Sequence, residues 1–98
     1  MFDEFGYPNE KAHSKIIEWP SNDFPGLIKF VKNLWWQAEW GWREEREDDS
    51  IFCFISTGGW SENEELIGSM KKNQIFWLFC WVASHRGGHY EFEVKKHV

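Results

Sequence analysis

Two imidazoles and a guanidinium flank a pair of glycines near the C-terminal end of the sequence. The segment consists of Ser84, His85, Arg86, Gly87, Gly88, His89 and Tyr90. Such a turn, with cationic side chains and exposed backbone amides, can hold a phosphate or a carboxylate. A phosphoryl-transfer role would also need a metal or nearby carboxylates, and Glu64 and Glu65 are the candidate donors. The alternative, which we favour, is a hairpin turn whose glycines supply positive φ and whose polar neighbours are solvated.

A second glycine pair, Gly58 and Gly59, follows an apolar run and precedes a helical pattern. A strand, a glycine turn and a helix start can bind an anion at the helix N-terminus. Here the first helical turn carries Glu62, Glu64 and Glu65, whose carboxylates would repel a phosphate. We therefore expect this turn to serve packing and capping, with Ser61 and Glu64 spaced as a capping box.

The cysteines and the charge balance narrow the chemistry further. Cys53 and Cys80 each lie in an apolar run and lack the spacing of a zinc site or a disulfide framework. We therefore expect buried thiols, a reducing cytoplasm, no metal, no cofactor and no catalytic residue. A formal net charge of -5 argues against nucleic acid as a partner and favours a neutral or basic one. The longest apolar run is too short to span a membrane, and the N-terminus lacks the pattern of a secretory signal.

The first half of the sequence predicts an irregular arm, a helix and a hairpin. Residues 1–22 have weak periodicity and are expected to form an arm with little regular structure. Asp23 and Pro25 open an amphipathic helix that runs to Trp35. From Trp36 the alternation favours a strand, although a helix that continues to Gly41 competes with it. After an acidic turn over 44–50, a strand over 51–57 completes the hairpin.

The second half predicts a short helix after Ser61, closed by a left-handed Asn73, and a second hairpin. The run 75–84 is apolar on both alternating faces, which favours a central strand covered on both sides, although periodicity alone leaves a helix open. The run 89–94 alternates apolar and charged residues, as a half-buried edge strand does.

These elements predict an α+β domain over 23–98, preceded by the 1–22 arm. Its order is α-β-β-α-β-β, with a four-stranded, mainly antiparallel sheet, two short helices and an irregular N-terminal arm.

Aromatic residues are in excess, with eight Trp and nine Phe in 98 residues. Two short helices cover one face of such a sheet, whereas the pattern supplies apolar side chains for both faces. The second face must then be covered by the N-terminal arm, by a second copy of the chain or by another protein, and Trp and Tyr are favoured interface anchors.

Part of the chain resembles a group of small uncharacterised phage- and prophage-encoded proteins. The resemblance spans residues 56–94 and is carried by Ser56, Thr57, Gly58, Gly59, Trp60, Ser61, Asn63, Glu64, Asn73, Phe76, Trp77, Arg86, Gly87, Gly88, His89, Tyr90 and Phe92. Where members carry a small residue after the Trp-Ser pair, this chain has Glu62. The resemblance implies an accessory protein inside the host cell and supplies no activity or catalytic residue.

The sequence therefore favours a non-enzymatic module that binds a host or phage protein, or a second copy of itself as a homodimer, through exposed aromatics or acidic loops. In the acidic alternative, the carboxylates of 44–49 and 62–65 imitate a strip of nucleic-acid phosphates. The other open hypothesis is a small enzyme or anion-binding domain built on the histidine turn. The candidate binding residues are Trp40, Trp42, Trp60, Glu64, His85, Arg86, His89 and Tyr90.

Overall fold

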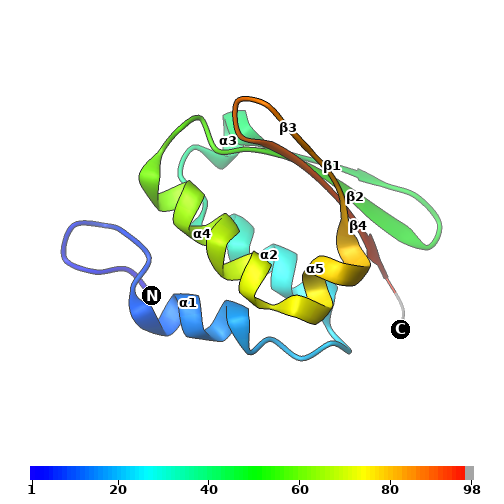
Figure 1. Ribbon diagram of the computed structural model, residues 1–98, viewed down its shortest axis with the longest axis horizontal. Coiled ribbons are helices and arrows are strands. Elements are labelled where there is room, and N and C mark those ends of the chain that lie inside the picture. Colours follow the sequence, from blue (N-terminus) through cyan, green and yellow to red (C-terminus); the bar gives the residue numbers. More distant parts are fainter. Residues whose placement is uncertain (97–98) are drawn as a thin grey trace.

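A computed structural model describes residues 1–96. Within this range the chain forms an antiparallel sheet of order β1-β2-β4-β3, and Figure 1 shows α1, α2, α4 and α5 together on one side of it. The elements are α1 (Glu10–Ile17), α2 (Phe24–Leu34), α3 (Ala38–Gly41), β1 (Trp42–Arg46), β2 (Ser50–Ser56), α4 (Ser61–Lys72), α5 (Gln74–Cys80), β3 (Trp81–His85) and β4 (His89–Lys95). The expected α+β class and four-stranded antiparallel sheet are confirmed, whereas the number of helices was underestimated.

The predicted strand over 75–84 is wrong for most of its length. Asn73 accepts a hydrogen bond from the Phe76 amide (3.2 Å) and starts helix α5, which buries Phe76 and Cys80 one turn apart. Only β3, at the edge of the sheet, is extended, and β4, expected at the edge, is a central strand between β2 and β3. A strand that is apolar on both faces needs cover on both faces, and in this fold the helices cover one.

The predicted strand from Trp36 begins only at Trp42. Gln37 adopts a left-handed conformation (φ 59°), and the one-turn helix α3 follows it. The competing expectation, a helix that ends at Gly41, is closer to the structure. Glu44 to Arg46, expected in the acidic turn, belong to β1, so the turn itself is limited to residues 47–49.

The N-terminal arm contains a helix that was not expected. Asn9 caps α1 by accepting the Ala12 amide (3.0 Å), and Ala12 and Ile16 are buried. Asn73 is not left-handed; its side chain instead donates to the backbone oxygens of Ile16 and Trp19. The arm therefore packs among the helices and does not cover the open face of the sheet.

The two faces of the sheet differ in chemistry. The helix-covered face and the helices enclose a core that includes Trp42, Cys53, Ile55, Phe92 and Val94. The open face carries aromatic and charged side chains in cross-strand rows, including Arg43, Phe54 and Glu91 in one row and Glu45, Phe52 and Glu93 in the next; Arg43 and Glu45 are exposed and the other four are half-buried. This face is therefore mostly polar, which corrects the expectation that apolar side chains line both faces of the sheet.

Candidate functional site

The two glycine turns meet at one end of the sheet. The Thr57 amide donates to the Gly88 carbonyl over 2.9 Å. A Cβ placed on Gly88 would lie 2.2 Å from the Thr57 hydroxyl oxygen and 3.7 Å from a Glu64 carboxylate oxygen. Gly88 also has a positive φ of 79°, so the close approach and the backbone conformation both require glycine. Both glycine turns therefore lie at the same end of the sheet, beside Glu64.

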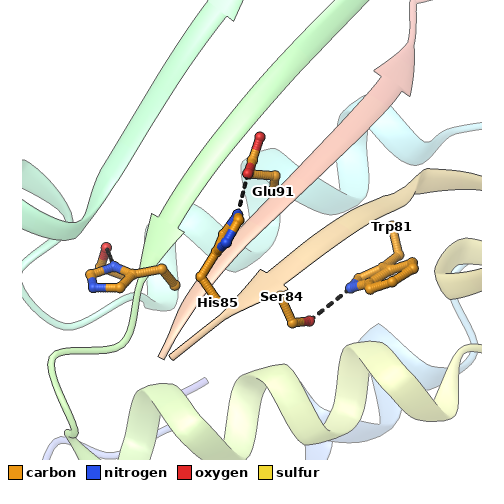
Figure 2. Close-up of polar contacts among 6 residues, drawn as sticks. Trp81, Ser84, His85 and Glu91 are labelled. Atoms are coloured by element: carbon orange, nitrogen blue, oxygen red, sulfur yellow. Dashed lines mark hydrogen bonds and ion pairs between the residues drawn. The ribbon is translucent and has the colours of Figure 1, made fainter. Parts of the chain in front are cut away.

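The groups of the histidine turn nevertheless do not converge. His85 and His89 are cross-strand partners and therefore lie on one face of the hairpin, the open face of the sheet. His85 pairs with the Glu91 carboxylate, as Figure 2 shows, and His89 Nδ1 is hydrogen-bonded to the Ser56 hydroxyl at 2.6 Å. Glu64 reaches the turn from helix α4, on the covered side.

The other members of the turn do not complete a reactive site. Arg86 is exposed. Tyr90 faces the covered side of the sheet, where its ring packs edge to face against Trp77 with the ring centroids 6.3 Å apart. Figure 2 also shows the Trp81 indole donating to the Ser84 hydroxyl (2.8 Å), a contact local to β3. Among residues 1–96, His, Cys, Asp and Glu side chains form no group of three or more that could hold a metal.

An exposed cluster of three indoles lies beside the same glycine turns. We call Trp36, Trp40 and Trp60 the indole cluster; their exposed fractions are 47%, 66% and 47%. The rings of Trp36 and Trp60 meet edge to face, with centroids 6.3 Å apart. A Cβ on Gly58 would lie 2.8 Å from the Trp60 ring and 3.1 Å from the Trp40 ring. Because Gly58 has no side chain, the rings of Trp40 and Trp60 can pack directly against its backbone.

Asn63 links the backbone of Trp36, in the indole cluster, to the backbone of Thr57. Its side chain is fully buried; it accepts the Trp36 amide (2.8 Å) and donates to the backbone oxygens of Trp36 (3.0 Å) and Thr57 (3.2 Å). The segment that carries Trp36 is therefore fastened to the end of β2. Because the Asn63 hydrogen bonds are shielded from water, their loss would leave buried polar groups unpaired.

Two further contacts fix the position of α3, which carries Trp40. The Trp35 indole donates to the Ser56 carbonyl (3.2 Å), and a Cβ on Gly41 would lie only 2.5 Å from that same oxygen. The end of β2 thus supports both Trp35, which precedes α3, and Gly41, the last residue of α3.

Acidic side chains accompany the indole cluster. Glu39 precedes Trp40 in α3, and Glu62 and Glu64 lie in the first turn of α4, directly after Trp60. Trp60 occupies the N-cap position and makes no side-chain capping bond, so the predicted capping box between Ser61 and Glu64 does not form. The Glu side chains remain close in sequence to the exposed indoles and favour a cationic partner.

One of the predicted binding residues, Trp42, lies in the core. Trp42, expected among the binding residues, is buried at 7% exposure, and its indole donates to Glu44 (2.8 Å).

The acidic turn at 47–49 and the carboxylates of 62–65 lie beyond opposite ends of β2, roughly 20 Å apart, and do not form one strip. Sequence reasoning missed Trp36 and Asn63 as site residues; the signal for Asn63 was an amide among carboxylates directly after a glycine turn.

Both cysteines are buried thiols, as expected. Burial, with a smaller contribution from Glu44, raises the pKa of Cys53 to about 12. Burial, with a smaller contribution from Glu93, raises the pKa of Cys80 to about 12. Neither thiol supplies a thiolate near neutral pH.

Comparison with protein families, with curated proteins and with solved structures finds no match. In the part of the chain that the structure describes, every helix is too short or too polar to cross a bilayer.

Proposed function

We propose that this protein is a non-enzymatic binding module that uses the indole cluster to capture a basic segment of another protein. The observation that carries the proposal is the exposure of Trp36, Trp40 and Trp60 on a scaffold fastened by Asn63. Trp is the residue most enriched among the energetic anchors of interfaces.

The rigidity of the support favours binding. An aromatic side chain that is already ordered loses little conformational freedom when a partner packs on it. The backbone at Trp36 is tied to Asn63, and the rings of Trp36 and Trp60 already pack on one another. Trp36 and Trp60 are thus held in place before a partner arrives.

The charge pattern favours a partner that presents Lys or Arg. A cation over an indole face gains about 0.5–2 kcal/mol, and nearby carboxylates add to the attraction. Glu39, Glu62 and Glu64 supply such carboxylates, and the whole chain has a net charge of -5. The same charge disfavours nucleic acid.

We further propose a phage or prophage accessory role in the host cytoplasm, on the basis of the sequence resemblance over residues 56–94. Among the residues that carry the resemblance, Thr57 and Gly88 hold the two glycine turns together, and Asn63 ties Thr57 to Trp36. Their roles here are structural, which supports binding rather than catalysis as the function of this region.

A peptide-display selection tests the proposal without knowledge of the partner. Random peptides are selected on the wild-type protein after depletion on a Trp40→Ser, Trp60→Ser double variant. We expect Lys- or Arg-containing peptides whose affinity, measured by titration calorimetry, falls at least tenfold in the double variant and weakens moderately with salt.

The matched control is Phe5→Ser, because Phe5 is an aromatic residue that is 75% exposed and lies in the N-terminal loop, outside the cluster. It should bind the selected peptides as the wild type does. Enrichment of no peptide, or of peptides that bind both variants equally, would overturn the proposal.

A further inference from the structure

Beyond its first residue, Gln74, helix α5 is apolar on all sides, although only part of it is buried. Phe76 and Cys80 face the core, whereas Ile75, Leu78 and Phe79 are 51%, 76% and 74% exposed. Val82, at the start of β3, continues this stripe at 48% exposure. In a soluble protein, a helix that is apolar all round is normally buried all round.

These residues form a second surface, which we call the α5 patch: Ile75, Leu78, Phe79, Trp81 and Val82. The patch and the indole cluster lie toward opposite ends of the molecule, since α5 precedes β3 and the glycine turn follows it (Figure 1). From Ile75 to Ser84 the sequence contains no Asp, Glu, Lys, Arg or His. A chain with a net charge of -5 can therefore bring two such patches together without placing like charges in contact.

We propose that the α5 patch is the interface of a two-fold homodimer. The patch offers a protrusion and a hollow side by side, as a self-complementary surface requires. Leu78 protrudes, and an adjoining pocket of about 340 Å³ is lined by Phe24, Ile75, Phe79 and Cys80, with Ser21, Glu93 and Lys95 at its polar margin. The Leu78 side chain of each subunit enters the pocket of the other.

The size of the patch fits this occupant. At roughly 150–250 Å² for each large apolar side chain, the exposed fractions leave about 600 Å² of patch per subunit, so a dimer buries about 1,200 Å². This is the lower limit for specific interfaces and predicts a weak dimer, with a dissociation constant in the low micromolar range or above. Within residues 1–96, the other edge strand, β1, carries Arg43, Glu45 and Arg46 and lacks such a patch.

Sedimentation velocity and light scattering of the full chain, from about 1 to 500 µM, measure the predicted equilibrium. We expect the mass to rise with concentration toward twice 11.8 kDa. Added salt should leave the dimer unchanged or favour it, because the five residues of the patch are uncharged, Glu93 and Lys95 at the pocket margin pair with one another within each subunit, and the two subunits repel one another weakly. Leu78→Glu and Leu78→Lys should both be monomeric, which separates loss of the apolar contact from a change in net charge.

The control is Phe5→Glu, which introduces the same charge at a site of nearly equal exposure, 75% against 76%, and should remain dimeric. Circular dichroism checks that each variant is folded. A wild type that stays monomeric up to 500 µM overturns the proposal, as do Leu78 variants that dimerise like the wild type. The dimer proposal and the peptide-capture proposal can fail independently. The Trp40→Ser, Trp60→Ser double variant should lose peptide binding but still dimerise, because neither residue belongs to the α5 patch.

Discussion

Asn63 hydrogen-bonds both backbone groups of Trp36, 27 positions away in the sequence. Its carboxamide accepts the Trp36 amide at 2.8 Å and donates to the Trp36 carbonyl at 3.0 Å. Asparagine suits this position because it carries an acceptor and a donor on one planar group. The contact joins the start of α4 to the segment that enters α3, and so joins Trp60 to Trp36.

Asn63→Ala should therefore destabilise the protein by about 2–4 kcal/mol, because the fully buried Asn63 side chain makes three hydrogen bonds to backbone groups, one of them buried and two partly buried. Urea denaturation measures the change. Asn33→Ala, at an exposed position in α2, should change the free energy of unfolding by no more than about 0.5 kcal/mol. Equal effects of both substitutions would show that the buried hydrogen bonds contribute little.

Gly88→Ala and Gly59→Ala separate steric contact from backbone strain. Both glycines have a positive φ (79° and 75°), so each substitution costs about 1 kcal/mol of strain. Only Gly88 is closely approached, by the Thr57 hydroxyl, whereas space beside Gly59 is open. Thermal unfolding should show Gly88→Ala to be less stable than Gly59→Ala by about 1–3 kcal/mol. Similar losses for both would mean that the two turns can move apart freely.

The buried thiols predict a loss of stability in alkaline solution. Above the ordinary cysteine pKa of 9.0 the unfolded chain releases thiol protons, whereas the folded chain keeps them up to about pH 12. The unfolded state then binds fewer protons, so the free energy of unfolding falls as the pH rises from 9 to 12, by up to about 1.4 kcal/mol per pH unit for each thiol. Urea titrations at pH 8, 9 and 10 measure this slope, and the Cys53→Ala, Cys80→Ala double variant should lack most of it.

His85→Ala combined with His89→Ala tests the alternative that the histidine turn is the functional site. Each imidazole is exposed and has a single partner of its own, Glu91 or Ser56, so the double variant should remain folded. It should bind the peptides selected on the indole cluster with unchanged affinity. A tenfold or greater loss of binding would place the histidines in the binding site and favour the anion-binding hypothesis.

Local sequence signals predicted some elements well. The capped amphipathic pattern after Asp23 predicts α2, and Asp23 accepts the Gly26 amide (3.1 Å) as a cap does. The β-branched and aromatic residues of 51–57 predict β2, and the glycine pair before His89 predicts the β3–β4 turn. Each of these features arises between residues that are close in sequence, where spacing and capping chemistry are sufficient.

Elements supported by distant contacts were misassigned. Helix α1 contributes only Ala12 and Ile16 to the core, and Asn73, far along the chain, bonds the carbonyl of Ile16. Segment 75–84 is apolar on all sides, so periodicity could not choose between helix and strand. The tertiary structure decided between them. The helices cover only one face of the sheet, and the segment forms helix α5 followed by the edge strand β3.

For the candidate sites, the sequence by itself determined the excess of aromatic residues, the net negative charge and the two glycine turns. Only the tertiary structure decided that Trp42 is buried while Trp36, Trp40 and Trp60 are exposed together, and that the apolar stripe of α5 has no cover within residues 1–96. The physical reason is that composition sets how much apolar surface a chain carries. Which part of that surface is hidden from water depends on which distant segments pack against it.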